Sequence, residues 1–257
     1  MNLRVARYID RWVGFAVCLG LWAIGRAWTL LRGRTHVPGL LATTPPGDES
    51  LPPPRRILAI KFYGLGNIAM ILPTLQALAE AHPGVAIDFL TLPGNHGLLR
   101  QSGLVRRALT VEVGSLASFL GSVARLLAAL LRGRYDAVLD FEQFMKLSSI
   151  FAFLTGAPAR IGFNTEGQAR GWLYSHRIAY ADTDHMADIF MRLARPLEGA
   201  RHPAPRVRIR VDSAERESAL RAAGLPAAAR LITMHVGTGP NYDKIALKRW
   251  EPARFAA

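Results

Sequence analysis

The chain has 257 residues, of which 50% are hydrophobic and 20% charged, so it can bury a sizeable core and is not globally disordered. Its formal net charge of +13 points to a negatively charged partner: nucleic acid, an anionic membrane or a phosphorylated substrate. The sequence contains no basic helix with interleaved aromatics and no zinc-finger or RNA-recognition pattern, so we expect no nucleic-acid partner. A single cysteine, Cys18, excludes an internal disulfide.

Residues 1–34 form a hydrophobic segment that carries no charge from Trp12 to Gly25. This stretch is short for a bilayer crossing, which needs about 20 apolar residues. Arginines lie on both sides of it, so the positive-inside rule does not orient it. Trp12, Trp22 and Trp28 are typical of a membrane interface. We expect a membrane-associated helix, spanning or in-plane, and the alternative is a helix packed on the protein or on a partner.

A proline-rich stretch without periodicity follows at 35–54 and predicts a partly extended linker. From Arg55 onward, strand and helix patterns alternate, which predicts an α/β fold with a doubly wound, mainly parallel sheet. We expect strands at 56–61, 85–91, 107–112, 136–140, 159–163, 206–211 and 230–236, and helices at 68–81, 96–102, 145–155, 184–198 and 213–223, with a longer helix after Gly114. These elements divide into a Rossmann-like domain at 55–225 and a second unit at 226–257.

The longer helix is apolar around most of its circumference, and Ser115 is its expected N-cap. Two interpretations are open. It is either a buried packing helix or a lipid-facing helix that acts together with the hydrophobic N-terminal segment.

The most informative stretch runs from Arg56 to Leu78, where an apolar strand leads through a glycine turn into an amphipathic helix. Gly64 and Gly66 are expected to supply the unusual backbone angles of this turn. The turn ends at a helix N-terminus, whose free N–H groups and dipole favour an anion or a hydroxyl. The pattern therefore predicts a ligand site.

Two other motifs admit functional interpretations. Gly64-x-Gly66-x-x-Ala69 formally fits the dinucleotide fingerprint, with Asp88 at the spacing of a ribose-binding acid, although Asp88 lies inside its strand. Asp182-x-Asp184 has the form of a metal-binding pair, but Asp184 directly precedes a helix. We expect Asp184 to be an N-cap and expect no metal site.

Four segments, at 60–91, 135–164, 185–199 and 230–257, resemble glycosyltransferase family 9, the ADP-heptose:lipopolysaccharide heptosyltransferases. They read IKFYGLGNIAMILPTLQALAEAHPGVAIDFLT, YDAVLDFEQFMKLSSIFAFLTGAPARIGFN, HMADIFMRLARPLEG, and RLITMHVGTGP with LKRWEPARFAA. The order and spacing of these pieces agree with the family, and the resemblance covers about residues 55 to 257.

The resemblance implies a GT-B glycosyltransferase, in which an N-terminal domain holds the acceptor and a C-terminal domain holds a nucleotide-sugar. Transfer proceeds with inversion and without a metal or other cofactor. Basic side chains stabilise the departing nucleotide phosphate. The expected donor-binding residues are His235, Gly237, Thr238, Lys248 and Arg249. The sequence ends in the first helix of the second domain, so we expect only the start of that domain, an apparent truncation, and no activity from this chain alone.

Asn67 stands where the family's L-G-D motif has its catalytic aspartate. An amide cannot act as a general base, but it can hydrogen-bond an acceptor hydroxyl or cap the helix. Asn67 and a substitute base, Glu142, are therefore the candidate catalytic residues. The candidate acceptor-binding residues are Tyr63, Gly64, Gly66 and Asp140.

The sequence thus predicts a glycosyltransferase of the heptosyltransferase type. Its expected partners are a nucleotide-sugar donor, with ADP-heptose as a candidate, a lipid-linked or cell-envelope saccharide acceptor and an anionic membrane surface. We expect it at the cytoplasmic face of the inner membrane, as a peripheral protein or with a single N-terminal anchor. One alternative is a non-catalytic truncated remnant or acceptor-binding scaffold, and the second is an NAD(P)-binding Rossmann enzyme.

Overall fold

The structure is a computed structural model, which describes residues 3–31, 51–112, 115–181, 183–200, 203–226 and 230–232. The chain forms two compact units, Met1–Arg210 and Val211–Ala257. The predicted domain boundaries at 34, 54 and 225 stay predictions. Of the second unit, the described part contains one helix, α7 (Ser213–Ala222), which Asp212 caps by accepting a hydrogen bond from the N–H of Ala214 at 2.8 Å.

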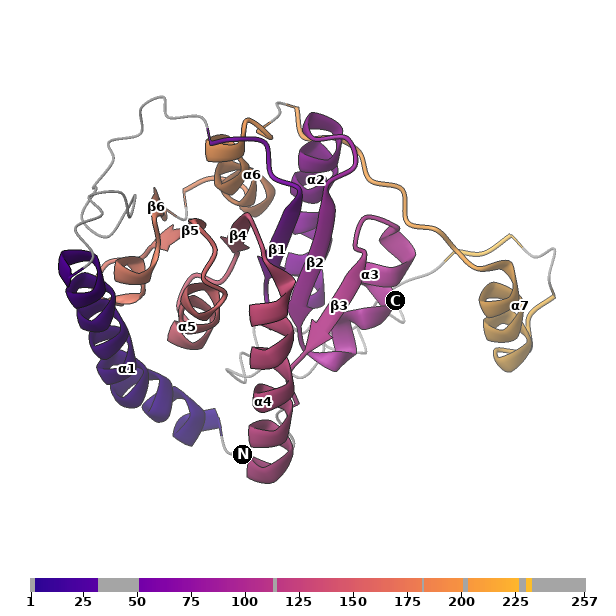
Figure 1. The fold of residues 1–257 in the computed structure, drawn as a ribbon. Helices are drawn as coiled ribbons and strands as arrows, with labels where there is room; N and C mark the ends of the chain where they lie inside the picture. Colours follow the sequence, from indigo (N-terminus) through magenta and orange to yellow (C-terminus); the bar gives the residue numbers. More distant parts are fainter. Residues whose placement is uncertain are drawn as a thin grey trace. The chain divides into compact units, whose positions relative to one another are not determined.

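A six-stranded sheet with every strand pair parallel lies at the centre of the first unit (Figure 1). Its strands are β1 (Arg56–Ile60), β2 (Ala86–Thr91), β3 (Arg107–Thr110), β4 (Ala137–Asp140), β5 (Ala159–Asn164) and β6 (His176–Ala179). Their spatial order is β3-β2-β1-β4-β5-β6. This is the order of a doubly wound Rossmann-like sheet, so the predicted α/β fold class is confirmed.

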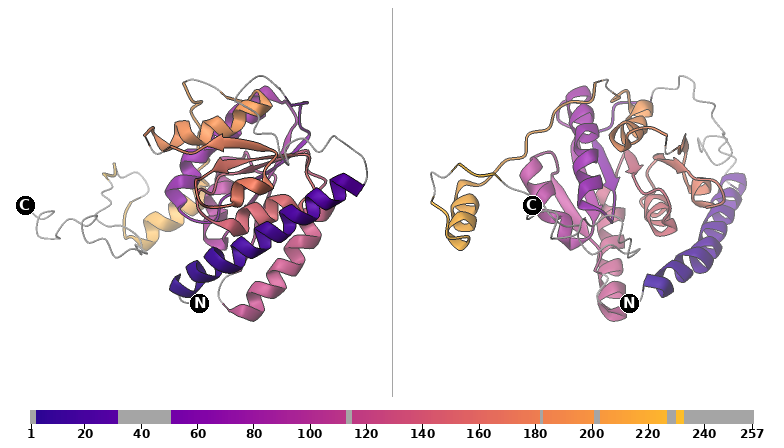
Figure 2. Two further views of the ribbon diagram at one scale, coloured as in Figure 1. Left: turned by 90° about the vertical axis from the view of Figure 1, so that its left-hand side faces the viewer. Right: turned by 180° about the vertical axis from the view of Figure 1, so that it is seen from behind.

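Helices cover both faces of this sheet (Figure 2). The helices are α1 (Leu3–Leu31), α2 (Leu65–Ala81), α3 (His96–Ser102), α4 (Leu116–Gly133), α5 (Lys146–Leu154) and α6 (Met186–Met191), with 3₁₀ turns η1 (Pro93–Asn95), η2 (Arg170–Leu173) and η3 (Arg192–Leu197). Side chains of α2, α3, α6 and η3 share one core cluster, and those of α4 and α5 share the other. The strands alternate between the two clusters, because successive strand residues point to opposite faces. In β1, Ile57 and Ala59 lie in the first cluster and Leu58 and Ile60 in the second.

The capping pattern explains where α4 begins. The hydroxyl of Ser115 accepts a hydrogen bond from the N–H of Ser118 at 3.1 Å, and the hydroxyl of Ser118 accepts one from the N–H of Ser115 at 3.0 Å. This reciprocal pair satisfies two backbone donors. The predicted N-cap is therefore confirmed.

The elements predicted from Arg56 to Phe163 are present in the structure, and so are the helices predicted at 184–198, as α6 and η3, and at 213–223, as α7. The interval 206–211 was expected to form a strand, and this was wrong, because its residues are in none of the sheet's strands. Residues 230–232 are not in a strand either, and the rest of the predicted strand at 230–236 lies outside the described residues. Conversely, β6 was missed, since His176–Ala179 is a short edge strand, only partly buried, whose sequence HRIA has no apolar run.

The hydrophobic N-terminal segment forms the helix α1, and its side chains are described from Asp10 to Ile24. It packs on α5 and η2 of the first unit. Within the described part of the chain, we find no helix that is both long enough and apolar enough to cross a membrane. The linker residues 35–50 lie outside the described residues.

Candidate functional site

The carboxyl ends of β1 and β4 meet at the centre of the sheet, where Ile60 pairs with Asp140. From β1 the chain crosses one face to β2, and from β4 it crosses the other face to β5. Such a reversal of strand order leaves a crevice outside the strand ends, where α/β proteins bind ligands. The carboxyl ends of these strands and the two segments that follow them therefore form the candidate site. They contain each predicted catalytic and acceptor-binding residue, at 63–67 and at 140–142.

Glu142 joins the two segments through both of its carboxylate oxygens. Its Oε1 accepts hydrogen bonds from the backbone N–H groups of Phe62 at 2.8 Å and Tyr63 at 3.4 Å. Its Oε2 accepts one from the Nζ of Lys61 at 3.0 Å, and the same ammonium donates to the Oε1 of Gln143 at 3.0 Å. Lys61 is 2% exposed and Glu142 5% exposed, so this is a buried ion pair with hydrogen-bonded ends.

The two oxygens of Glu142 are thus engaged in holding the loop after β1. The prediction that Glu142 acts as a general base stays untested. To accept a proton from a substrate, its carboxylate would first have to release either the loop N–H groups or Lys61. The geometry therefore indicates that Glu142 positions the loop after β1.

Asp140, the last residue of β4, is completely buried. Its Oδ2 accepts hydrogen bonds from the Nη2 of Arg170 at 2.9 Å and from the hydroxyl of Tyr174 at 2.5 Å, and its Oδ1 accepts one from the N–H of Glu142 at 3.0 Å. Burial raises the pKa of Asp140, while the positive charge of Arg170 and the hydroxyl of Tyr174 oppose that shift. Burial and these hydrogen bonds give the carboxylate of Asp140 a structural role, and its predicted contact with an acceptor stays a prediction.

Arg170 ties this network to the loop above it. Its Nη2 also donates to the Oγ of Ser148 at 3.1 Å, and its Nη1 donates to the backbone carbonyl of Glu142. The side chain is fully buried although it is charged. Since Asp140 supplies its counter-charge, the arginine fixes the backbone that carries Glu142.

The glycine turn begins where the buried network ends. Gly64 has φ 89°, in the left-handed region, and an added Cβ would lie 2.9 Å from the Nδ2 of Asn67. The positive φ favours glycine at this position, and any other side chain would also displace the carboxamide of Asn67. Helix α2 starts at Leu65, three residues earlier than predicted.

This earlier start corrects two expectations. Gly66 lies inside α2, is not among the residues with positive φ and has open space around its Cα, so it does not shape the turn. Asn67 is the third residue of the helix and not its cap. Its carboxamide lies beside Gly64 at the helix N-terminus, where first-turn N–H groups lack backbone partners.

The part of the site that faces solvent is the turn and not the carboxylates. Tyr63 and Asn67 are half-buried, and the three residues between them are exposed. The arrangement can therefore offer backbone N–H groups and one carboxamide to an anion or a hydroxyl, on a loop that a buried ion pair holds in place.

Sequence reasoning missed five members of this network: Lys61, Gln143, Ser148, Arg170 and Tyr174. Lys61 had a signal, because a charged residue directly after a fully apolar strand marks a strand end. Arg170 had none, since it reaches Asp140 only through the fold, thirty positions away in the sequence.

The predicted donor-binding residues lie outside the described residues; they are His235, Gly237, Thr238, Lys248 and Arg249. The structure therefore leaves their role a prediction.

The dinucleotide and metal motifs have structural explanations. Asp88 is fully buried inside β2, and its carboxylate accepts hydrogen bonds from Arg106, Arg107 and Tyr135. The carboxylate of Asp88 is therefore not available to bind a ribose. The NAD(P) alternative depended on this residue. Among the described residues, no three His, Cys, Asp or Glu side chains are grouped so as to hold a metal ion.

The expectation that Asp184 caps the following helix was wrong. The N-cap of α6 is His185, whose Nδ1 accepts a hydrogen bond from the N–H of Ala187 at 3.3 Å. Asp184 forms an ion pair with Arg192 instead. Asp182 lies outside the described residues.

Comparison with known proteins agrees with this architecture. A family model, glycosyltransferase family 9 (heptosyltransferase), matches residues 123–257, just over half of the chain. The structure of the glycosyl transferase family 9 protein from Veillonella parvula DSM 2008 superposes with a TM-score of 0.64 at 20% identity, covering 79% of this chain and 57% of that one. The structure of E. coli ADP-heptose lps heptosyltransferase II superposes with a TM-score of 0.53 at 20% identity, covering 67% and 51%. A comparison with curated proteins gave no match.

The chain spans only 57% and 51% of the lengths of these two structures, and at 20% identity their likeness concerns the fold. The family model rests on the sequence itself and covers the β4–α5 segment that carries Glu142. This family match, together with the fold, shows that the chain belongs to glycosyltransferase family 9, the heptosyltransferase family.

Proposed function

We propose that the protein takes part in transferring a sugar from a nucleotide-sugar to a hydroxyl of a lipid-linked or cell-envelope saccharide. Membership of family 9 supports the reaction class. The name of the E. coli structural neighbour makes ADP-heptose the first donor to test and lipopolysaccharide the first acceptor. Donor supply assigns the reaction to the cytoplasmic face of the inner membrane.

In this reaction the acceptor oxygen bonds to the anomeric carbon while the bond from that carbon to the nucleotide diphosphate breaks. The acceptor proton passes to solvent water at the exposed turn, and the diphosphate departs with the bonding electron pair, so the anomeric configuration inverts. The residues that the resemblance assigns to the donor, Lys248 and Arg249 foremost, would stabilise the charge that develops on the phosphate. The proposal involves no metal.

The observation that carries the proposal is the loop at the β1/β4 strand ends. Glu142 and Lys61 fix it from below, and it presents Gly64, the first turn of α2 and Asn67 to solvent. We assign Asn67 to binding the acceptor hydroxyl and Glu142 to holding the loop in place. The carboxamide of Asn67 can orient that hydroxyl but cannot take its proton.

A second function follows from the same residue. Because Asn67 is not a base, the protein could bind the acceptor without turning it over, as an acceptor-binding scaffold. The discriminating experiment uses the full-length protein, ADP-heptose and heptose-free lipopolysaccharide, with ADP release and the acceptor's mass as readouts. For transfer, we expect Asn67→Asp to increase the rate by about 10²- to 10⁴-fold, the typical contribution of a general base.

The matched control is Asn164→Asp, which changes an exposed residue at the end of β5 in the same way and should leave the rate unchanged. If neither the natural protein nor Asn67→Asp releases ADP or adds mass to the acceptor, the transfer proposal fails. Binding of the same lipopolysaccharide in that case would establish the scaffold function.

A further inference from the structure

Helix α1 has two different sides, and the side that faces the domain contains small and polar residues. Gly14 and Cys18 are buried there, and an added Cβ on Gly14 would lie 3.1 Å from the Cβ of Lys146. Asp10 lies on the same side and accepts hydrogen bonds at the N-terminus of α5. Positions 10, 14 and 18 recur at intervals of four, so they form one stripe along the helix. This stripe places α1 against the domain along its length.

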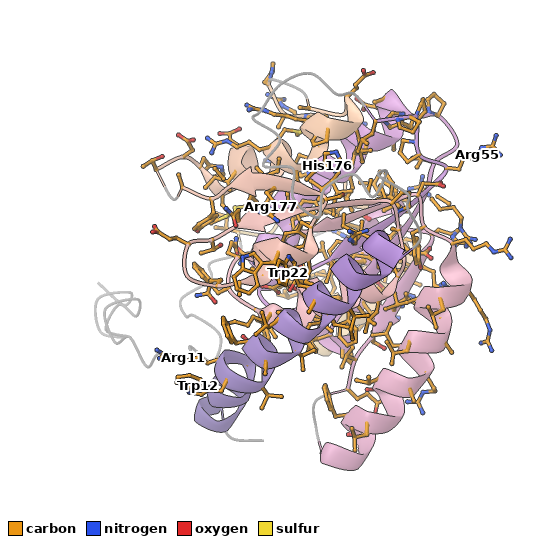
Figure 3. The ribbon with its side chains drawn as sticks, turned by 60° about the vertical axis from the view of Figure 1, so that its left-hand side comes forward. Arg11, Trp12, Trp22, Arg55, His176 and Arg177 are labelled. Carbon is orange, nitrogen blue, oxygen red and sulfur yellow. The ribbon has the colours of Figure 1, made fainter. Side chains whose placement is uncertain are left out.

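Aromatic contacts continue the inner side toward the C-terminal half of α1. The ring of Trp22 lies 6.0 Å from that of Trp172 in η2, and Phe15 meets Trp172 edge-on at the same distance. Figure 3 shows Trp22 directed toward the domain, whereas Arg11 and Trp12 project away from it. The helix therefore packs through one side and leaves the other uncovered.

The uncovered side is apolar. Trp12 is 57% exposed, Val13 53% and Ile24 64%. Its further members are Ala16, Leu19, Gly20 and Ala23, which are also exposed. Among the α1 side chains described between Trp12 and Ile24, none carries a charge. This apolar face of α1 extends over about 18 Å of helix.

Helix α4 repeats the pattern. Leu120 is 57% exposed and Leu131 64% exposed, while Leu126 and Leu130 are buried in the core. Figures 1 and 2 show α1 and α4 on the same side of the sheet, on either side of α5. Two uncovered apolar helix faces thus lie on one side of the first unit.

The charges of these helices indicate which partner would cover them. The sequence of α1 contains four arginines and one acidic residue, and that of α4 contains two arginines and none. The only acidic residue, Asp10, is turned inward to α5. At the outer end, the guanidinium of Arg11 lies 5.6 Å from the ring centroid of Trp12. An apolar strip flanked by arginines complements a bilayer with anionic headgroups.

We propose that α1 lies in the plane of an anionic membrane, with its outer face, Trp12 to Ile24, in the interface, and that the outer face of α4 makes a second contact. The inner stripe binds the helix to the domain, so the domain stays at the membrane surface. This inference does not depend on the reaction proposed above, because it concerns a surface remote in sequence from Asn67.

The test measures binding of the full chain to vesicles of phosphatidylcholine, alone or mixed with phosphatidylglycerol, in the absence of any acceptor saccharide. We expect the phosphatidylglycerol mixture to bind at least about tenfold more strongly, and added salt to reduce that difference. The double variant Val13→Glu with Ile24→Glu should reduce binding by at least about tenfold. Val211→Glu with Ile232→Glu is the matched control, because it makes the same two changes at exposed positions of the second unit.

Two further readouts test the orientation. Brominated acyl chains should quench tryptophan emission in the natural chain and much less in Trp12→Phe. Leu120→Glu with Leu131→Glu should weaken vesicle binding, which tests the contact from α4. Each position is exposed, so circular dichroism should show an unchanged fold in every variant.

Wild-type vesicle binding by the Val13→Glu, Ile24→Glu variant would overturn the proposal, and so would equal binding to the two lipid mixtures. Light scattering tests whether a second copy of the chain covers the apolar face of α1 instead. If that variant converts a dimer into a monomer and leaves vesicle binding intact, the face joins two copies of the chain and does not meet lipid. A failure to bind vesicles would leave sugar transfer to a water-soluble acceptor unaffected, so the two proposals fail separately.

Discussion

Lys61 and Glu142 form a buried ion pair, Nζ to Oε2 at 3.0 Å, which joins the ends of β1 and β4. Neither strand end alone determines the shape of the turn that follows β1. Because Glu142 also accepts hydrogen bonds from the backbone N–H groups of Phe62 and Tyr63, it holds the turn against the sheet. The candidate site therefore depends on a contact between residues 81 positions apart.

Removing this carboxylate should be costly. Glu142→Ala leaves the Lys61 ammonium buried without its counter-charge, and breaking such a pair typically costs about 3 to 5 kcal/mol of the free energy of unfolding. Denaturant unfolding measures the loss. Glu217→Ala is the control, since Glu217 pairs with Arg221 in an exposed i,i+4 geometry and should cost about 0.5 kcal/mol or less. Similar losses in the two variants would contradict the role given to Glu142.

The two glycines of the turn should respond oppositely to alanine. Gly64→Ala places a Cβ at positive φ and against Asn67, which should destabilise the protein by about 1 to 2 kcal/mol. Gly66→Ala is in the first turn of α2 with open space around it, so it should be neutral or stabilising by up to about 1 kcal/mol. The same unfolding measurement compares them. If Gly66→Ala proves the more harmful of the two, the turn is not built as described.

Local patterns were sufficient to predict the core of the fold. The apolar strands and the helical spacing of Ile68, Ile71 and Leu75 gave the order of elements, because periodicity reports which face of each element is buried. The strand 206–211 was wrong for the same reason: RVRIRV alternates like a strand, but the described sheet ends at β6 without it. An alternating pattern shows that a segment could pair with a neighbouring strand. It does not show whether the sheet has a free edge to which that segment can add.

The sequence predicted which strand ends lie together, whereas the functional roles of the residues at those ends stay predictions. The glycine turn and the β4 end point to one sheet edge, because parallel strands align their carboxyl ends. Sequence reasoning could not tell that Asp140 lies beneath the loop with Arg170 while Glu142 reaches upward to it. Both are acids at the end of one strand, and their roles separate only when the burial of each side chain is known.

Asp10 should be the main polar attachment of α1. Its Oδ1 accepts hydrogen bonds from the N–H of Lys146 at 3.0 Å and of Leu147 at 3.2 Å, so it caps α5 from another helix. Asp10→Ala should cost about 1 kcal/mol, as the loss of an N-cap does, and should increase amide exchange at the start of α5 and in α1. Asp212→Ala, which removes the local cap of α7, is the control and should leave exchange in α1 unchanged. If Asp10→Ala leaves amide exchange in α1 and at the start of α5 as it is in the natural protein, the attachment is contradicted.

Asp88 should make the fold sensitive to acid. Burial raises the pKa of Asp88, but hydrogen bonds from Arg106 and Tyr135 outweigh that effect and hold it below its usual value. The unfolded chain therefore binds the proton more readily than the folded one. The stability from Asp88 is full above the unfolded pKa of about 3.9 and is lost as the pH falls through the lower, folded value.

Urea unfolding between about pH 7 and about pH 2 measures this loss. Asp88→Asn should lower the stability near neutral pH by about 2 kcal/mol, because hydrogen bonds to a charged group are lost, and should flatten the acid limb. Tyr135→Phe removes one donor and keeps the arginines, so the folded pKa of Asp88 should rise toward the unfolded value. The acid-dependent loss should then be smaller and should be complete at a higher pH. An acid limb in Asp88→Asn as steep as in the natural protein would assign the acid sensitivity to other carboxylates.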